Sequence, residues 1–120
     1  MIGRVHGRER FGAFGRAAPR GRADLVSVRY SPAADVAVPC LAYATPRRLG
    51  PAVVRNRIRR RLRAVFRELA EDRSVPLPPG DYLVMPTAGV ATATYSELHA
   101  QCRRALEDLA RRRLDVGGVR

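Results

Sequence analysis

Short apolar segments bounded by turn residues predict three β-strands along the chain. These segments are 25–30, 36–45 and 81–85. The first is rich in β-branched and aromatic residues, as strands are. The turn at 31–35 leads us to expect that the first two strands pair antiparallel. Pro39 and Pro46 should mark the ends of the second strand, because proline cannot donate a hydrogen bond to the ladder.

Two longer stretches have the 3.6-residue period of amphipathic helices. Their apolar positions are Val54, Ile58, Leu62, Val65, Phe66 and Leu69 in one, and Tyr95, Leu98, Cys102, Ala105, Leu106 and Leu109 in the other. Gly50-Pro51 predicts the start of the first helix, since proline is tolerated at the first helical position. This helix should run to about Asp72. Thr94 and Glu97 match a capping box that begins the second helix.

The N-terminal part of the chain has weaker signals. Residues 1–8 are expected to be frayed, whereas residues 8–16, with Phe11 and Phe14 three positions apart, predict a short helix. The Pro19-Arg20-Gly21 stretch should end it. No repeat or linker divides the sequence, and 120 residues is the length of one domain. We therefore predict a single α/β domain over residues 1–120 with an ordered core at about 8–113.

Composition makes this a cationic domain. The chain holds 23 Lys+Arg, all of them arginine, against 11 Asp+Glu, which gives a formal net charge of +12. A hydrophobic content of 46% is enough for a modest core. No run approaches the ~18 apolar residues of a membrane span, and the N-terminus has no apolar segment typical of a signal peptide. We therefore expect a cytoplasmic protein with a polyanionic ligand and no membrane partner.

Most of the excess charge lies in two segments. Residues 1–22 hold six Arg and one Glu, and residues 47–63 hold eight Arg and no acid. Residues 64–120 hold eight Arg and eight acids, as an ordinary solvated surface does. The two cationic segments therefore need an explanation of their own.

On the predicted helix from Pro51 to Asp72, arginines fill nearly all of the surface outside the apolar stripe. A solvated helix face usually mixes Glu with Arg, because like charges three or four positions apart repel. We therefore interpret this acid-free face as a ligand-binding surface rather than a solvated one. Arginine suits phosphate, to which its planar group donates two parallel hydrogen bonds, and it stacks on bases. Asn56 adds a neutral donor and acceptor for a base edge or a ribose.

Histidine and cysteine offer little for catalysis or metal binding. His6 and His99 lie far apart in the sequence, and the arrangements that a protein nuclease needs are absent from it. Cys40 and Cys102 lie on apolar faces without metal-ligand spacing, so we interpret them as reduced core thiols. We predict no catalytic residue and no metal site in the chain itself.

Three acids near the end of the first long helix form the remaining candidate. Glu68, Glu71 and Asp72 lie within about one turn and could attract Mg²⁺ weakly. Ion pairing with neighbours such as Arg67 and Arg73 is the commoner explanation.

A longer motif in the cationic segment is far more specific than its charge. It reads Gly50-Pro51-Ala52-Val53-Val54-Arg55-Asn56-Arg57-Ile58-Arg59-Arg60 and continues through Leu62, Arg63, Phe66 and Glu68. This motif resembles the RNR signature of the bacterial ribonuclease P protein subunit family. Arg47-Arg48 stands where that family has a pair of basic residues. The predicted strands and helices also follow the family's order along nearly the whole chain.

The resemblance implies a fold and a function. The fold is an α+β sandwich, a small mixed sheet packed by helices, with a left-handed β-α-β crossover where the general rule predicts the opposite hand. Family members join a catalytic RNA that removes the 5′ leader of precursor tRNA endonucleolytically. The chain is thus expected to act within an enzyme whose chemistry the RNA carries, with Mg²⁺ held mainly by that RNA and no cofactor held by the chain. Its expected partners are the catalytic RNA and precursor tRNA, with no stable protein partner.

The resemblance also implies two sets of binding residues. Those expected to contact the catalytic RNA are Arg47, Arg48, Arg55, Asn56, Arg57, Arg59, Arg60 and Arg63. Those expected to contact the leader are Phe11, Phe14, Ser27, Arg29, Ala44 and Tyr82. Val28 stands where the family commonly has an aromatic residue, so stacking on the leader falls to Phe11, Phe14 or Tyr82.

Two other functions fit a small basic α/β domain. A structural RNA-binding protein of ribosomal type would have no effect on the cleavage of precursor tRNA. A DNA-binding module would place the arginine helix in a major groove, but a recognition helix needs a variety of base-reading side chains, and this face is nearly all arginine.

Overall fold

A computed structural model of the chain describes residues 2–5, 11–15, 18–33 and 35–118, the last six of these as backbone only. Its elements are β1 (Gly3–Arg4), β2 (Arg20–Arg22), β3 (Val26–Ser31), β4 (Pro39–Tyr43), the short 3-10 helix η1 (Arg47–Leu49), α2 (Ala52–Glu71), β5 (Gly80–Pro86), a second 3-10 helix η2 (Ala88–Ala91) and α3 (Tyr95–Gly118). No helix in these ranges is both long and apolar enough to cross a bilayer.

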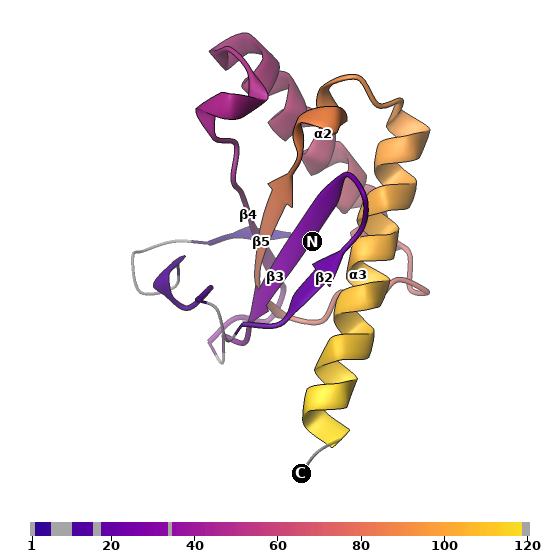
Figure 1. Cartoon of the computed structure of the whole chain (residues 1–120). Coiled ribbons are helices and arrows are strands. Elements are labelled where there is room, and N and C mark those ends of the chain that lie inside the picture. The colour runs from indigo at the N-terminus through magenta and orange to yellow at the C-terminus, as the bar shows by residue number, and fades with distance from the viewer. Residues whose placement is uncertain (1, 6–10, 16–17, 34, 119–120) are drawn as a thin grey trace.

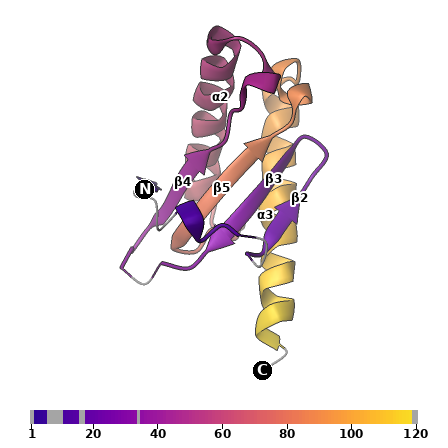
Figure 2. The same cartoon turned by 60° about the vertical axis from the view of Figure 1, so that its left-hand side comes forward.

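The strands form one mixed sheet of five strands in the order β1-β4-β5-β3-β2. The β1–β4 and β4–β5 pairs are parallel, whereas the β3–β5 and β2–β3 pairs are antiparallel. Both long helices lie behind the sheet in Figure 2, and the segment around residues 11–15 lies in front of it. The predicted α+β architecture, a mixed sheet packed by helices, is therefore confirmed.

The predicted pairing of the second strand is wrong. We expected it to pair antiparallel with the first, but β4 pairs parallel with β1 and β5, and β5 separates it from β3. The reason is that β5 is apolar on both faces, with Tyr82 and Val84 toward the long helices and Leu83 toward the other face. Such a strand stabilises the sheet most when it lies at the centre of the sheet. No turn residue in the sequence indicates this position.

The connection from β4 through α2 to β5 links two parallel neighbours. With α2 behind the sheet, the chain steps from β4 on the left to β5 on the right in Figure 2, which is the left-handed crossover that the resemblance implied. The predicted helix is confirmed as α2, with one correction at its start. Pro51 is the N-cap, with an extended ψ of 166°, rather than the first helical residue.

The main core lies between the helices and the sheet. From α2 it contains Ile58, Leu62, Val65, Phe66 and Leu69, all fully buried, and from α3 it contains Leu98, Cys102, Ala105, Leu106 and Leu109. This set matches the predicted stripes except at their first members, since Val54 is half-buried and Tyr95 is 38% exposed. The Thr94 hydroxyl accepts a hydrogen bond from the Glu97 N–H at 3.1 Å, as the capping box predicted.

The N-terminal segment covers part of the opposite face of the sheet. Residues 3–4 form β1 rather than a frayed end, and Val5 is buried with Phe14 and Cys40 in a second, smaller cluster. The strand signal was missed because β1 pairs only with the distant β4. Of the short helix predicted at 8–16, residues 8–10 and 16 lie outside the described residues. Residues 11–12 are helical, as predicted, and the helix ends in a turn at residue 13, where the Phe14 N–H donates a hydrogen bond to the Phe11 carbonyl at 3.2 Å.

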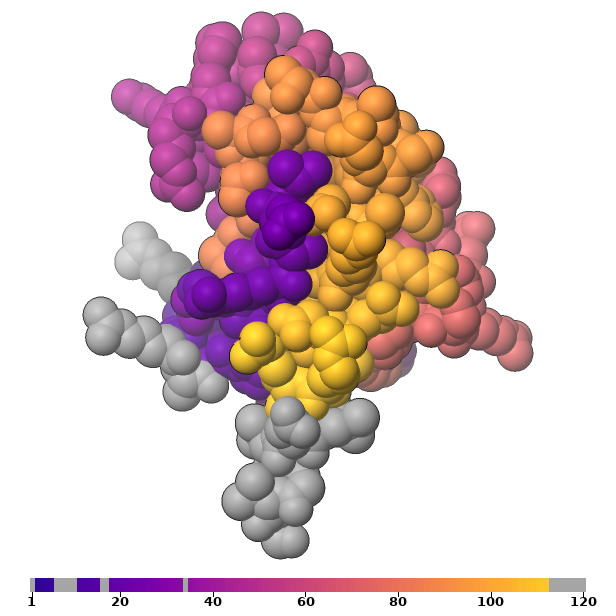
Figure 3. Space-filling view, turned by 45° about the vertical axis from the view of Figure 1, so that its right-hand side comes forward, coloured from indigo at the N-terminus to yellow at the C-terminus, as the bar shows by residue number. Residues whose placement is uncertain are grey.

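The edge strand β2 was also missed, and it lies directly against α3 (Figure 3). Gly21 makes this approach possible, because a Cβ atom there would lie 2.0 Å from the Ala105 carbonyl oxygen and 2.6 Å from the Leu109 nitrogen. Asp108 of α3 fixes the same contact by accepting a hydrogen bond from the Arg22 N–H at 2.8 Å.

Gly21→Ala should therefore lower the free energy of unfolding by at least about 1–3 kcal/mol, since backbone of α3 would have to move. Gly12→Ala is the matched control, because a Cβ atom there meets no described atom within 4 Å. Urea unfolding of both variants measures the difference. Equal stability of the two variants would contradict the close approach of β2 to α3.

Asp108 also links folding to pH. It pairs with Arg111 at 3.1 Å and with Arg112 at 3.0 Å. Burial raises the pKa of its carboxyl, but the hydrogen bonds from Arg22 and Arg112 outweigh that effect and hold the pKa below its usual range. A group with a lowered folded-state pKa stabilises the protein above its unfolded-state pKa, and this contribution is lost as the pH falls through that value toward the folded pKa.

We expect Asp108→Asn to reduce stability near pH 7 and to make the loss of stability between about pH 5 and pH 2 less steep. Urea unfolding midpoints across that range measure the slope. The exposed Asp35 provides the control variant, Asp35→Asn. A slope unchanged by Asp108→Asn would remove this carboxyl from the acid transition.

Candidate nucleic-acid interface

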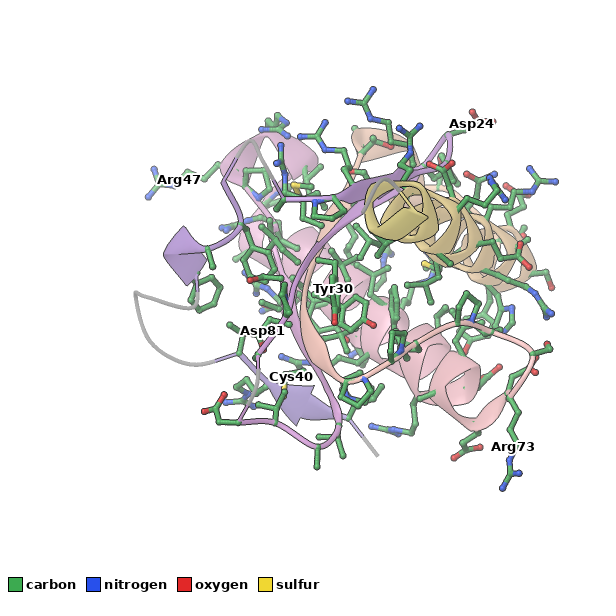
Figure 4. All side chains as sticks on the ribbon, turned by 90° about the horizontal axis from the view of Figure 1, so that it is seen from below. Asp24, Tyr30, Cys40, Arg47, Arg73 and Asp81 are labelled. Carbon is green, nitrogen blue, oxygen red and sulfur yellow. The ribbon has the colours of Figure 1, made fainter. Side chains whose placement is uncertain are left out.

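One side of α2 carries the cationic surface predicted from the sequence. Its apolar stripe is buried, which leaves the arginines of the RNR segment outside the core. Arg47, Arg48, Arg57, Arg60, Arg63 and Arg67 are exposed, and Arg55, Arg59 and Arg61 are half-buried. Arg47 and Arg73 point away from the molecule on opposite sides in Figure 4. The arginines from Arg47 to Arg67 thus lie on two consecutive elements, η1 and α2.

These arginines lack acidic partners. Among the described residues, no arginine from Arg47 to Arg67 takes part in an ion pair. On α3, by contrast, Arg103 pairs with Asp72 at 3.3 Å and with Glu107 at 3.6 Å. No acid of the described residues cancels the charge of the α2 arginines, so this charge is available to an external anion.

Not every arginine of α2 is equally free. Arg61 donates one hydrogen bond to the Val90 carbonyl at 3.1 Å and another to the Ala93 carbonyl. Arg57 donates to the Ala91 carbonyl at 3.3 Å, and Arg55 donates through Nε to the Gly50 carbonyl at 3.2 Å. These contacts tie α2 to the neighbouring turns. Arg61 is half-buried and donates two of these hydrogen bonds, so we expect its side chain to stabilise the fold rather than to bind a ligand.

Asn56 and Arg59 act as a pair at the predicted RNA-binding surface. Arg59 Nη1 donates a hydrogen bond to Asn56 Oδ1 at 2.8 Å. This contact orients the guanidinium group and leaves the Asn56 amide donors available. The predicted RNA-binding residues thus lie on one continuous stretch formed by η1 and α2, and their contact with RNA stays a prediction.

A groove of about 820 Å³ separates α2 from the edge of the sheet, and we call it the β1–α2 groove. Its lining comes from Ile2, Gly3, Arg4, Val5 and Phe11, from Leu41, Ala42 and Tyr43 of β4, and from Arg59, Arg63, Arg67, Ala70 and Glu71 of α2. A second hollow of about 520 Å³, the Ala44 groove, begins where the first ends. Tyr43 and Arg59 line both.

Sequence reasoning missed Tyr43, which stands at the junction of the two grooves. Its ring packs edge-on against Phe66 at 6.4 Å, and the Arg63 guanidinium lies 6.0 Å from the ring centroid. Burial raises the pKa of Tyr43 to about 12 against the opposing effect of Arg63, so the phenol stays neutral. The helical spacing from Arg59 and Arg63 could have identified Arg67 as a further member of the site. No signal pointed to Tyr43.

The residues predicted to contact the leader fall on two faces. Strand alternation places Ser27 and Arg29 on the face opposite the long helices, and Ala44 lines the groove named after it. Arg29 Nη1 donates a hydrogen bond to the Gly15 carbonyl at 2.9 Å, which holds the N-terminal segment on that face. Tyr82 is different, because its side chain is fully buried in the main core on the helix side.

Phe11 and Phe14 also differ in how far their rings are exposed. Phe14 is only 8% exposed and packs with Val5 and Cys40, whereas Phe11 is 45% exposed on the rim of the β1–α2 groove. Of the three aromatic residues predicted to stack on the leader, Phe11 therefore has the accessible ring.

The acids near the end of α2 make contacts within the protein. Glu68 accepts a hydrogen bond from the Tyr95 hydroxyl at 2.6 Å and lies 3.5 Å from His99 Nε2. Asp72 pairs with Arg103. The ion pairing predicted for Asp72 is confirmed, but its partner comes from α3 rather than from the adjacent Arg67 or Arg73. Within the described ranges, no three His, Cys, Asp or Glu side chains are grouped to hold a metal ion.

The two cysteines are buried free thiols, as predicted. Burial raises the pKa of the Cys102 thiol to about 12, which keeps it protonated and unreactive. His6, the second candidate histidine, lies outside the described residues.

The sequence is similar to those of ribonuclease P proteins. A sequence model of the family described as Ribonuclease P matches residues 3–110. The ribonuclease P protein component of Thermus scotoductus is 37% identical over 87 residues, which are 72% of this chain and 48% of that protein. That of Geobacillus sp. (strain WCH70) is 33% identical over 76 residues, which are 63% of each. The chain thus spans about half the length of the Thermus relative.

The fold is also that of solved ribonuclease P proteins. A mutant RNase P protein of Staphylococcus aureus, described as defective in mRNA degradation activity, superposes with a TM-score of 0.74 at 19% identity, over 87% of this chain and 85% of that one. The RNase P protein from Thermotoga maritima gives a TM-score of 0.72 at 18% identity, over 86% and 94% respectively. At such low identity, this likeness supports the fold alone.

The distinction between structural and free arginines can be tested by stability. Arg61→Ala should lower the free energy of unfolding by about 1–3 kcal/mol, because two carbonyls lose a charged donor. Arg60→Ala removes the same charge from an exposed side chain and should change stability by less than about 0.5 kcal/mol. Urea unfolding measures both. Equal losses would mean that the Arg61 contacts do not stabilise the fold.

Proposed function

The chain belongs to the ribonuclease P protein component family, and from this premise we propose that it serves as the protein subunit of a ribonuclease P ribonucleoprotein. In this role it binds the catalytic RNA and the 5′ leader of precursor tRNA in the cytoplasm. It thereby supports the endonucleolytic removal of the leader that produces the mature 5′ end.

The observation that carries the proposal is the arginine face of α2, which has no acidic partner among the described residues. An unpaired cationic face costs stability unless an anion neutralises it, and RNA supplies phosphates in a regular array. The residues expected to make these contacts are Arg47, Arg48, Arg55, Asn56, Arg57, Arg59, Arg60 and Arg63. Arg67 joins them because it lines the same groove.

In this proposal, the leader binds the face of the sheet that lies opposite to the long helices. Ser27, Arg29 and Ala44 supply polar and small positions there, and Phe11 supplies an accessible ring. We leave Tyr82 out of this set because it is fully buried. Mg²⁺ chemistry falls to the RNA in this proposal, so the chain acts by neutralising phosphates and by positioning the substrate.

Reconstitution tests the function directly. The full chain, mixed with a bacterial ribonuclease P RNA at low Mg²⁺, should stimulate cleavage of precursor tRNA at the mature 5′ end, because added cations on the protein replace part of the metal requirement. Gel analysis of the products measures it. Binding to the RNA without stimulation would favour the structural, ribosomal-type alternative.

The salt dependence of binding tests the arginine face. Each phosphate contact contributes about 0.7–0.9 to the slope of log K against log salt, so Arg60→Ala should flatten the slope by about that amount. Arg73→Ala removes the same charge beyond the end of α2 and should leave the slope unchanged. Filter binding to ribonuclease P RNA measures both variants. Equal slopes for the two would place Arg60 outside the interface.

A further inference from the structure

The β1–α2 groove has a cationic wall and an apolar floor. Resting on the function proposed above, we propose that this groove binds one unpaired ribonucleotide of the catalytic RNA. The base lies against the floor, and the phosphates on either side of it contact arginines of α2. The site thus adds a stacked base to the phosphate contacts proposed for this helix.

The wall is built from Arg59, Arg63 and Arg67 of α2. Their spacing of four residues puts them on one side of the helix and spreads them over about 12 Å. This length is enough for the arginines to contact more than one phosphate of a single strand. Arg4 of β1 faces the groove from the other side. Four guanidinium groups therefore meet one chain of phosphates.

The floor is suited to a base rather than to more phosphate. Leu41, Ala42 and Tyr43 of β4 form it, with Ile2 and Val5 beside them. A volume of about 820 Å³ is large enough for a nucleotide, since small-molecule sites occupy about 300–1,000 Å³. Bases within an A-form duplex are stacked and lie in a groove that side chains read poorly. The occupant must therefore be unpaired.

Planar groups line the path that a base would take. The Arg63 guanidinium in the wall lies 6.0 Å from the centroid of the Tyr43 ring in the floor. Both an aromatic ring and a guanidinium plane stack on bases without regard to their identity. The groove therefore favours an unpaired base over a bare anion.

Glu71 orients the nucleotide in the groove. It is the only carboxylate among the described lining residues, and it lies on the last turn of α2, three turns from Arg59. A carboxylate repels phosphate and accepts hydrogen bonds from the amino groups of a base. The phosphates are thus directed toward Arg59 and the amino edge of the base toward Glu71.

The order of the strands assigns the groove to the catalytic RNA rather than to the leader. The groove lies at the β1–β4 edge of the sheet, next to α2. Ser27 and Arg29, which we assign to the leader, lie on β3, which β5 separates from β4. A nucleotide in the groove is therefore continuous with the RNA on the α2 arginines.

Ala70→Leu tests the site by filling the groove without changing the charge. Ala70 is half-buried in the groove wall. In filter binding to ribonuclease P RNA without precursor tRNA, we expect the affinity of the full chain to fall about tenfold, as for the loss of one stacked base. The salt slope should not change, because the phosphate contacts remain. Ala100→Leu, at an exposed position of α3, should bind as the unmodified chain does.

The outcomes separate the two proposals. Unchanged affinity of Ala70→Leu for both the RNA and precursor tRNA, when the unmodified chain binds the RNA and stimulates cleavage, overturns the groove and leaves the function standing. An unmodified chain that does not bind this RNA overturns both. Intact RNA binding with weakened binding of precursor tRNA overturns the assignment to the catalytic RNA and gives the groove to the leader.

A measurement on the unmodified chain avoids any effect of the variants on folding. Adenosine 5′-monophosphate and inorganic phosphate are titrated separately while the backbone amide signals are followed by NMR. We expect the Ala42 and Ala70 signals to shift with the nucleotide and not with phosphate. Identical shifts with both probes would contradict a base on the floor of the groove.

Discussion

The burial of one stripe of α2 is the interaction on which the rest of the structure depends. Ile58, Leu62, Val65, Phe66 and Leu69 are fully buried, and each contributes on the order of 1.5–3 kcal/mol. Neighbouring arginines on the same helix repel by roughly 0.2–0.5 kcal/mol a pair. Burial is therefore the larger effect, and it lets α2 remain helical with an acid-free outer face before any RNA is present.

The two long helices show how one residue type takes on different roles. On α3, Arg103, Arg111 and Arg112 are paired with acids, and that surface has little charge left for a ligand. On α2, the contacts of Arg61 are carbonyl oxygens, which hold a guanidinium group in place without cancelling its charge. The position of the acids, rather than the number of arginines, thus decides which side of the molecule carries positive charge without acidic partners.

Local patterns in the sequence predicted the parts of the fold that depend on local contacts. The stripes of α2 and α3 are confirmed except at their first members, and the Thr94 cap is confirmed. The strand predicted at 25–30 is confirmed as β3, Val26–Ser31. Pairing could not be predicted, because β1 and β4 are brought together across more than thirty residues and β5 enters between β3 and β4. In the candidate site, too, only the features that depend on local contacts could be predicted. The arginine face follows from helical spacing, whereas the position of Tyr43 between two grooves and the burial of Tyr82 depend on which face each strand turns to the helices.

The central position of β5 in the sheet affects how the chain folds as it is synthesised. The β1–β4 and β2–β3 pairs have no ladder with each other, and β5 alone joins them. A two-stranded pair is marginally stable by itself, so neither half of the sheet can persist until residues 80–86 have been synthesised. Because folding that waits for distant partners is slow and exposes apolar strands, the nascent chain carries its arginine-rich segments through this interval. Like charges on these segments repel one another, which opposes association between unfinished chains while their apolar strands are exposed.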